Sequence, residues 1–299
     1  MARKKDQYTQ EERIQYYDDL RAGFQRTADA ALEQLVADLD RGATDHLKKY
    51  LKFMGRQHRY SPDNQRWIFS QCVARGIEPT LLKGAKQWEQ EGFKVAADQF
   101  TQGIAIQAPQ PWKKQVVNHK TGAEEEKSGV GFRVVWIYDA SQLDEESQKR
   151  LPQFFLPLAG DAEDIYAAVK RAVESDGIVV EYAPARTMGQ TQGYSQGGKI
   201  VQRDDLVSVN RTLNLVHEWA HEVLEHVKQL QEGQVDRHSA EIVAAVEYVV
   251  GQNLGLDFPF AADYLLSHGI TSKALKEQLE LVQSVSKKMI EKITREASA

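Results

Sequence analysis

Apolar residues recur at helical spacing near both ends of the chain. Between residues 8 and 55, Leu32, Leu35 and Leu39 stand three and four positions apart, so one face of a helix carries all three. The segment from Ser272 to Glu296 carries a longer stripe of the same kind, made of Leu275, Leu279, Val282, Val285, Ile290 and Ile293. Such stripes predict helices that bury their apolar face against the rest of a domain.

Other helices are predicted from their boundary residues and from the same periodicity. Ser61 is a good N-cap, Pro62 suits the first helical position, and Gly76 ends the segment. Apolar spacing predicts further helices at about residues 161–175, 208–230 and 237–253.

Runs rich in β-branched and aromatic residues predict a small amount of sheet. Residues 103–112 are typical of a short strand that ends in a proline-broken turn, and residues 115–141 are typical of a hairpin. Residues 124–126, three glutamates, are expected at the solvated tip of that hairpin. Residues 177–183 and 199–202 are expected to form strands in the second half. The chain is therefore predicted to be an α+β protein.

Length and charge divide the chain into two halves. Its 299 residues are enough for two domains with separate cores. Residues 1–140 hold 22 Lys and Arg against 19 Asp and Glu, whereas residues 141–299 hold 16 against 24. We expect a helical, small-sheet domain over residues 1–150 and a mainly helical domain with a small sheet over residues 151–299. Because their charges differ in sign, the two halves are expected to meet different partners.

The cellular setting is predicted from what the sequence lacks. Cys72 is the single cysteine, which excludes an internal disulfide and is typical of a reducing compartment. The charged N-terminus has no apolar segment behind it, and no run approaches 18 apolar residues. We expect a cytoplasmic protein without a secretory signal or membrane span.

The stretch LVHEWAHEVLEH, residues 215–226, carries the candidate chemistry. Residues four apart lie one turn above each other on a helix, so His217 and His221 present two imidazoles to one point. Glu218 stands beside the first of them, which completes the HExxH pattern of zinc hydrolases. The alternative is an amphipathic helix that carries two histidines and binds no metal.

A catalytic zinc ion needs a third protein ligand. We expect Glu241 to supply it from the next helix, with His238 in reserve. His226 is disfavoured because five residues correspond to about 140° around a helix beyond His221. Glu247 is expected to face elsewhere, since six residues turn it about 240° from Glu241.

The first half carries a nucleic-acid signal. Between residues 46 and 86, nine basic residues stand against two acidic ones, interleaved with aromatic residues. Positive charge follows phosphates and aromatic rings stack on bases, a combination that suits single-stranded nucleic acid. Trp67, Phe69 and Trp88 are expected in the core. The predicted contacts are Arg56, Arg59, Tyr60, Arg66, Lys94, Lys113 and Lys114. The alternative is a solvated basic face over an aromatic core.

Segments in both halves resemble ArdC-type antirestriction proteins. The first half contains RYSPDNQRWIF, KQWEQEGFKV, TQGIAIQAP and GFRVVWIYDASQ, and the second contains GYSQGGKIVQ, NLVHEWAHEVLEH and AEIVAAVEYVVGQNLGLD. They occur in the order of the family and cover most of residues 45–257. The resemblance implies an N-terminal single-stranded-DNA-binding domain joined to a zincin-like metallopeptidase domain. Around Glu241 the chain departs from the family pattern Glu-x-Glu-Ala-Glu, because Ala244, Ala245 and Glu247 fill neighbouring places.

The sequence thus favours a single-stranded-DNA-binding protein with a zinc-dependent peptidase domain. Glu218 would be the general base, and Tyr194 is a candidate hydrogen-bond donor to the reacting carbonyl oxygen. The expected partners are single-stranded DNA and a DNA-bound or restriction-related protein substrate. The rival hypothesis is a DNA-protecting antirestriction protein in which zinc is structural. A third is a helical scaffold without metal.

Overall fold

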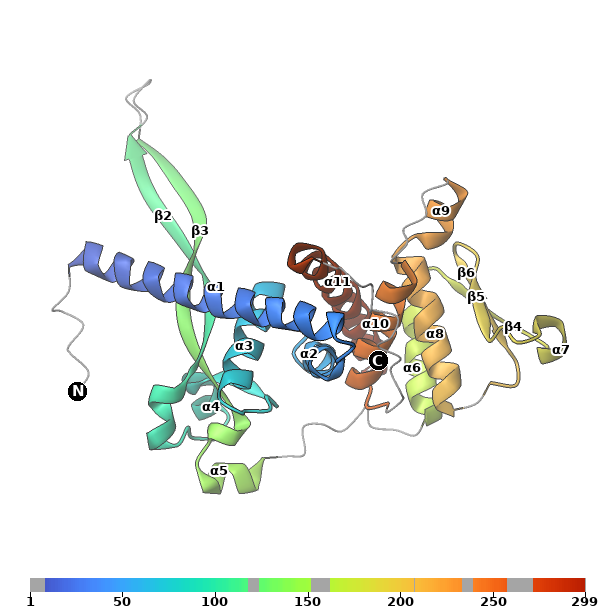
Figure 1. Ribbon diagram of the computed structural model, residues 1–299, viewed down its shortest axis with the longest axis horizontal. Helices are drawn as coiled ribbons and strands as arrows, with labels where there is room; N and C mark the ends of the chain where they lie inside the picture. Colours follow the sequence, from blue (N-terminus) through green and yellow to red (C-terminus); the bar gives the residue numbers. More distant parts are fainter. Residues whose placement is uncertain are drawn as a thin grey trace. The chain divides into compact units, whose positions relative to one another are not determined.

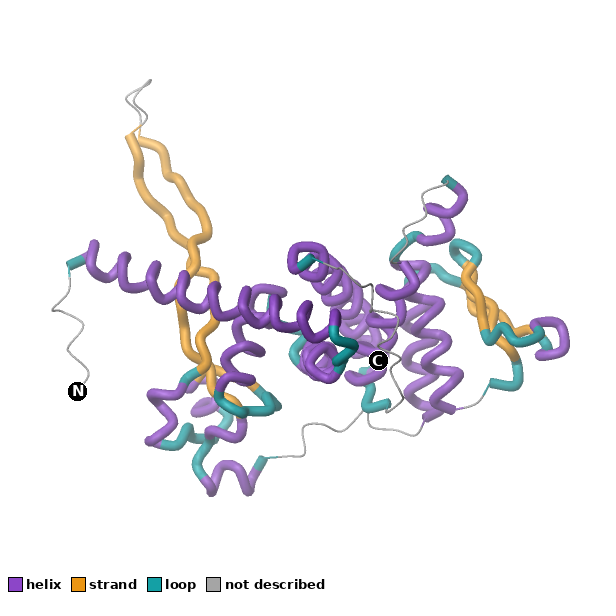
Figure 2. The backbone as a smooth tube through the Cα atoms, in the orientation of Figure 1, coloured by secondary structure: helices purple, strands orange, loops and turns teal. Residues whose placement is uncertain are grey.

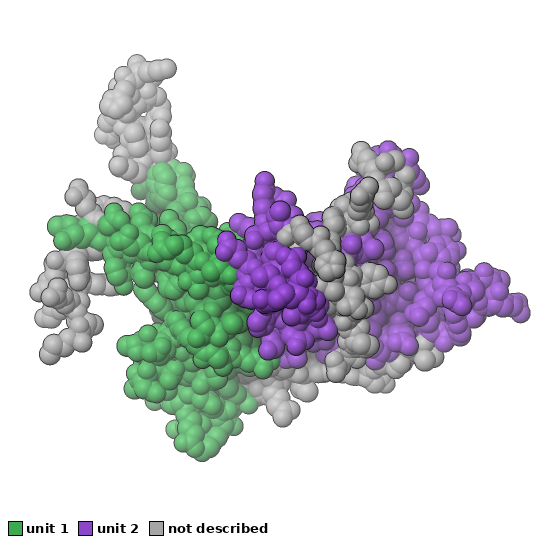
Figure 3. All heavy atoms as spheres, in the orientation of Figure 1, with its two compact units in different colours: residues 1–31, 63–152 green, residues 32–62, 153–299 purple. Residues whose placement is uncertain are grey.

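The structure is a computed structural model that describes residues 9–117, 124–151, 162–206, 208–232, 239–256 and 271–298. Its helices and its two three-stranded sheets confirm the predicted α+β class (Figures 1 and 2). Within the described ranges, no helix is both long and apolar enough to cross a membrane. The chain forms two compact units, residues 1–31 with 63–152 and residues 32–62 with 153–299 (Figure 3).

Residues 32–62 group with the second unit because α2 (Asp45–Arg56) packs closely on α10 (Ser239–Asn253). A Cβ atom on Gly55 would lie 2.5 Å from the carbonyl oxygen of Val249, so glycine is what allows the two backbones to approach. The Asn253 side-chain amide also donates to the Gly55 carbonyl at 3.0 Å. The expected division into domains at residue 150 stays a prediction.

The first unit combines one antiparallel sheet with helices. It holds residues 10–31 of α1 (Gln10–Asp40), then α3 (Pro62–Ala74), β1 (Leu82–Gly84), α4 (Ala85–Gln90), β2 (Ile104–Val117), β3 (Glu124–Asp139) and α5 (Glu145–Arg150), with short 3-10 helices at Ala97–Gln102 and Ala140–Gln142. The strand order is β1-β3-β2. Trp67 packs with Ala28, Ala105 and Val134 in one buried cluster. Trp88 lies in a second cluster and Phe69 is also buried, which confirms the predicted core positions of all three aromatic residues.

Two side-chain amides of α3 cover the outer edge of β2. Asn64 accepts from the Gln107 backbone N–H at 2.7 Å and donates to its carbonyl at 2.9 Å. Gln71 makes the same pair of bonds with Ala105, at 2.9 Å and 3.0 Å. These bonds satisfy backbone groups that an edge strand otherwise leaves unpaired.

β2 does not end at its prolines as predicted. The N–H groups of residues 105 and 107 point away from β3 towards α3, so those of the next odd-numbered positions also face outward. Pro109 and Pro111 therefore remove no bond of the β2–β3 ladder, and the strand continues to Val117. Glu124, Glu125 and Glu126 pair within β3 instead of forming the hairpin tip, and the tip itself lies outside the described residues.

The second unit is mainly helical. Besides residues 32–40 of α1 it contains α2, α6 (Ala162–Ser175), β4 (Val179–Ala183), α7 (Ala185–Met188), β5 (Gly193–Ser195), β6 (Lys199–Arg203), α8 (Ser208–Val223), α9 (His226–Gln231), α10 and α11 (Ser272–Ala297). Its sheet has the order β4-β6-β5, with β4 parallel and β5 antiparallel to β6. α10 packs against α2, α8 and α11, and α8 also contacts α6, β5 and β6. The predicted helices at 161–175, 237–253 and 272–296 are confirmed as α6, α10 and α11.

The predicted helix over residues 208–230 is two helices. Glu225 has a φ of 54°, in the left-handed region that non-glycine residues rarely adopt, and it separates α8 from α9. The prediction of one continuous helix was wrong here, because no glycine or proline marks the break. Because of this break, His226 does not lie where a continuous helix would place it relative to His221.

Candidate functional site

His217 and His221 lie side by side on α8, as the four-residue spacing predicts. Their ring centroids are 5.1 Å apart and the ring planes meet at 60°. Both side chains are half-buried, while the opposite side of the helix is embedded through Leu215 and Trp219. The pair therefore stands at a partly sheltered position in the second unit.

Glu247 of α10 orients the first histidine. Its Oε2 lies 2.8 Å from His217 Nδ1, and the carboxylate is one-fifth exposed. Burial lowers the pKa of His217, but the hydrogen bond and charge of Glu247 outweigh burial, so this pKa lies above its ordinary value. With Nδ1 donating to the carboxylate, the lone pair of a neutral ring is on Nε2. The expectation that Glu247 faces elsewhere was wrong.

Glu218 is buried between the histidine pair and the strand region before α8. Its residue exposure is 7 %, and burial raises the pKa of its carboxyl, with the charge of Glu247 acting in the same direction. The charge of His217 and a backbone hydrogen bond from Ser195 act against this increase. A buried carboxylate with a raised pKa is suited to accepting a proton.

His226 contacts the second histidine because of the break at Glu225. The Nδ1 atoms of His221 and His226 are 2.9 Å apart, and their ring centroids are 5.0 Å apart. The angular argument that placed His226 away from His221 assumed a continuous helix, and it does not apply. Burial, together with His217 and His226, lowers the pKa of His221 to about 4. His221 is therefore neutral at pH 7, which is the form that binds metals.

Glu222 fixes the turn between β5 and β6 against α8. It accepts hydrogen bonds from Ser195 Oγ at 2.6 Å, Gly197 N at 2.8 Å and Gly198 N at 2.7 Å. Both glycines have positive φ angles, 78° and 86°. Tyr194, in β5 of the same turn region, is exposed and pairs through its backbone with Val201. Sequence reasoning missed Glu222, since two of its three partners are backbone N–H groups, which have no sequence signature.

Glu241, the predicted third ligand, does not form a metal-binding group with His217 and His221 among the described residues. Among the described residues, no three His, Cys, Asp or Glu side chains form a group that could hold a metal ion. Glu241 is half-buried at the start of α10, and Glu247 is the α10 carboxylate in contact with His217. His238 lies outside the described residues. The assignment of Glu241 as the third ligand stays a prediction.

Two side chains of this site, His217 and His221, are suitable ligands for a divalent metal ion such as zinc. His217 and His221 supply imidazole nitrogens, the commonest protein ligands of zinc besides thiolates. The contact between His217 and Glu247 has the form of the carboxylate–histidine pairs that orient metal ligands. The third ligand is expected from Glu241, with His238, outside the described residues, in reserve.

Comparison with known proteins places the N-terminal part of the chain in a family. Residues 18–139 match the model of the N-terminal domain of the anti-restriction factor ArdC. This part of the chain is an ArdC-type N-terminal domain.

The metal-free crystal structure of the antirestriction protein ArdC from plasmid R388 has a similar fold. Its TM-score is 0.50 at 15 % identity, and the match covers 91 % of this chain and 97 % of that chain. The Mn(II)-bound structure of the same protein gives 0.45 at 16 % identity, over 91 % and 98 %. The sequence matches none of the curated proteins.

The predicted DNA contacts are divided between the two units. Arg56, Arg59 and Tyr60 belong to the second unit, where Tyr60 is half-buried and its carbonyl accepts from Gln283 at 2.7 Å. In the first unit, Lys94 and Lys113 are exposed. Lys114 lies on β2, and its side chain is outside the described part.

Arg66 differs from the other predicted contacts because it is buried. Its exposure is 6 %, and its guanidinium is paired with Asp63 one helical turn earlier in the chain. This burial does not suit a direct phosphate contact.

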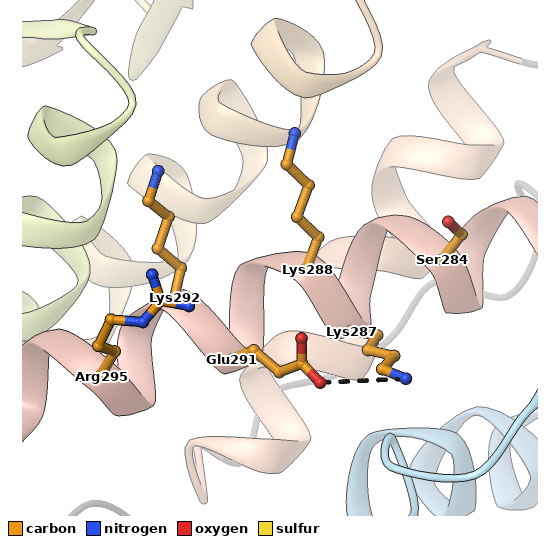
Figure 4. A pocket seen from close by; sticks show the side chains of 6 residues that line it. All are labelled: Ser284, Lys287, Lys288, Glu291, Lys292 and Arg295. Atoms are coloured by element: carbon orange, nitrogen blue, oxygen red, sulfur yellow. Dashed lines mark ion pairs between the residues drawn. The ribbon is translucent and has the colours of Figure 1, made fainter.

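A basic groove on α11 lies apart from the histidine pair in the sequence. It has a volume of about 310 Å³ and is lined by Ser284, Lys287, Lys288, Glu291, Lys292 and Arg295. Figure 4 shows Lys287 turned towards Glu291, with which it forms an ion pair of 4.0 Å. Lys292 pairs with Asp176. Carboxylates thus offset part of the positive charge of this groove.

Proposed function

We propose that this protein binds single-stranded DNA and carries a zinc site for peptide hydrolysis in its second unit. The observation that carries the metal half is the contact of His217 with Glu247 beside His221. It orients one imidazole of a pair on a single helix face. The DNA half is supported by the N-terminal family match and by exposed basic side chains of that region, among them Lys94 and Lys113.

In this proposal, Nε2 of His217 and Nε2 of His221 hold the metal, and Glu241 is the third ligand. Zinc bound there would supply the Lewis acidity that makes water a nucleophile at neutral pH. Glu218 accepts the proton during attack on a peptide carbonyl and returns it to the leaving amine. Tyr194, exposed in β5, is proposed to donate a hydrogen bond to the developing oxyanion.

A second function is favoured by one observation: the family match covers the N-terminal domain of an anti-restriction factor and does not include the histidine pair. In that alternative the protein protects DNA and the metal only holds α8 in place. No peptide bond is then cut, and Glu218 has no chemical role.

Metal content and proteolysis of the full chain separate these functions. We expect zinc in near-equal molar amount in the wild type and its loss in His217→Ala. Glu218→Gln keeps both histidines, so zinc should stay while cleavage of protein substrates, assayed with and without single-stranded DNA, falls about 100-fold or more. Glu232→Gln, the same change at an exposed position directly after α9, is the matched control. Zinc retention with no cleavage in any form would favour the structural role, and an absence of zinc would refute both.

A further inference from the structure

Trp112 is an exposed aromatic residue with one ring face supported by backbone. It lies on β2, directly opposite Gly129 of β3 in the long two-stranded ribbon of the first unit (Figures 1 and 2). A Cβ atom on Gly129 would lie 2.7 Å from Trp112 Cζ2 and 2.9 Å from Cε2. The indole therefore lies against the backbone of this glycine, in the place of a side chain, yet Trp112 is 46 % exposed. Glycine supports the ring on one side, and nearly half of the residue is accessible to solvent.

A second glycine, Gly131, leaves the surface beside the indole without a side chain. Gly131 lies on the same face of the ribbon, two residues from Gly129. A Cβ atom there would sit 3.7 Å from Trp112 Cδ1, an ordinary contact, so packing does not require glycine at this position. A glycine inside a strand weakens it and often marks the close approach of a ligand.

Positive charge accompanies this surface. Arg133 is exposed and follows Gly131 on the same face of the ribbon, whereas exposed Lys113, next to Trp112 in sequence, is on the opposite face. An exposed aromatic ring with a cationic side chain on the same face is an arrangement that suits single strands, because the ring stacks on a base and the cation neutralises a phosphate.

We propose that Trp112 is a base-stacking residue for single-stranded DNA, supported by Gly129, with Arg133 placed to contact the phosphate backbone. This inference rests on the proposed DNA-binding function and specifies where that function is carried out. The open indole face takes one nucleobase of any identity, since every base has a π-face.

Tryptophan fluorescence of the full chain tests the stacking directly. Trp67, Trp88 and Trp219 have exposures of 1 %, 0 % and 0 %, so a quench on binding reports on Trp112 and Trp136. We expect oligothymidylate to quench the wild type and Trp136→Ala. In Trp112→Ala the quench should be lost and Kd should rise about tenfold, with an unchanged salt slope because stacking releases no counterions. Trp136 is 39 % exposed on the opposite face of the ribbon, which makes it the matched control.

Two glycine variants test the same surface without removing the ring. Gly129→Ala places a methyl group where the indole lies, so it should displace Trp112 and weaken binding as Trp112→Ala does. Gly131→Ala makes only an ordinary contact with the indole, so the ring should keep its place and its fluorescence quench, and binding should weaken less than in Gly129→Ala. An abasic strand of equal length should bind the wild type and Trp112→Ala alike.

The outcomes separate this inference from the function on which it rests. A wild-type chain that binds no single strand overturns both. A wild type that binds, with unchanged affinity and quenching in Trp112→Ala, overturns the stacking assignment alone. Equal weakening on the abasic strand, or a change in oligomeric state instead of DNA affinity, also overturns it, since Trp112 would then have a structural or self-association role.

Discussion

Replacing Glu247 by alanine tests whether this carboxylate holds the first histidine for a metal. The change removes the 2.8 Å contact with His217 Nδ1 and leaves the ring free to rotate or to change tautomer. Carboxylates that orient a metal-bound histidine contribute about 10- to 100-fold to metal affinity, which is about 1.4 to 2.7 kcal/mol. The contact is one-fifth to one-third exposed, so we expect a value near the lower limit, about tenfold.

The assay is competition for zinc between the full chain and a chromogenic chelator at pH 7. Glu247→Gln is the informative partner variant, because its amide oxygen can still accept from Nδ1 and should recover part of the affinity. Glu241→Ala is the comparison for a direct ligand and is expected to lose more affinity than Glu247→Ala. His217→Ala, which removes a metal ligand, gives the zinc affinity expected when the site is lost.

Two results would refute the reasoning. An unchanged zinc affinity in Glu247→Ala would show that the carboxylate does not orient His217 for the metal. A loss as large as that of His217→Ala, with Glu241→Ala unaffected, would make Glu247 itself the third ligand and would exclude Glu241.

Two further predictions concern the second unit, and urea unfolding measures both. Gly55→Ala should lower the free energy of unfolding by about 1–3 kcal/mol, because the added Cβ would lie 2.5 Å from a backbone oxygen. Gly23→Ala is the control and should be neutral or stabilising, because its Cβ would meet only an arginine side-chain atom at 3.9 Å. Equal effects of the two variants would contradict the packing argument. The hydrogen bond from His46 lowers the pKa of buried Asp38, so its contribution to stability should be present above the ordinary aspartate pKa and lost as pH falls through the lower, folded-state value. His46→Ala should therefore be destabilising near pH 6, and a deficit that persists undiminished at the acid end would refute this linkage.

Periodicity was a reliable guide where one helix face is buried. The stripe from Leu275 to Ile293 predicted α11 to within a residue, and its six apolar members are all buried. Ser61, Pro62 and Gly76 likewise bounded α3, since Gly76 adopts the positive φ that ends helices. These features are local, so the sequence carries them in full.

Prediction failed where a distant element decides the outcome. β2 passes its prolines because Asn64 and Gln71 take the backbone groups on its outer edge, and no local pattern reveals that cover. The break at Glu225 has no glycine or proline to mark it. The same holds for Glu247, whose contact with His217 depends on how α10 packs against α8.

Three polar residues of LVHEWAHEVLEH each contact a different structural element. His217 contacts α10 through Glu247, His221 contacts His226 after the helix break, and Glu222 holds the turn between β5 and β6. Histidines on a merely amphipathic helix would point to solvent and would need none of these partners. Contacts of three elements with side chains of one helix limit side-chain motion before any ion arrives, which is what a metal site requires of its surroundings. The geometry therefore favours the metal-centre proposal over the hypothesis of a helix that binds no metal, and the identity of the third ligand is what divides a catalytic from a structural ion.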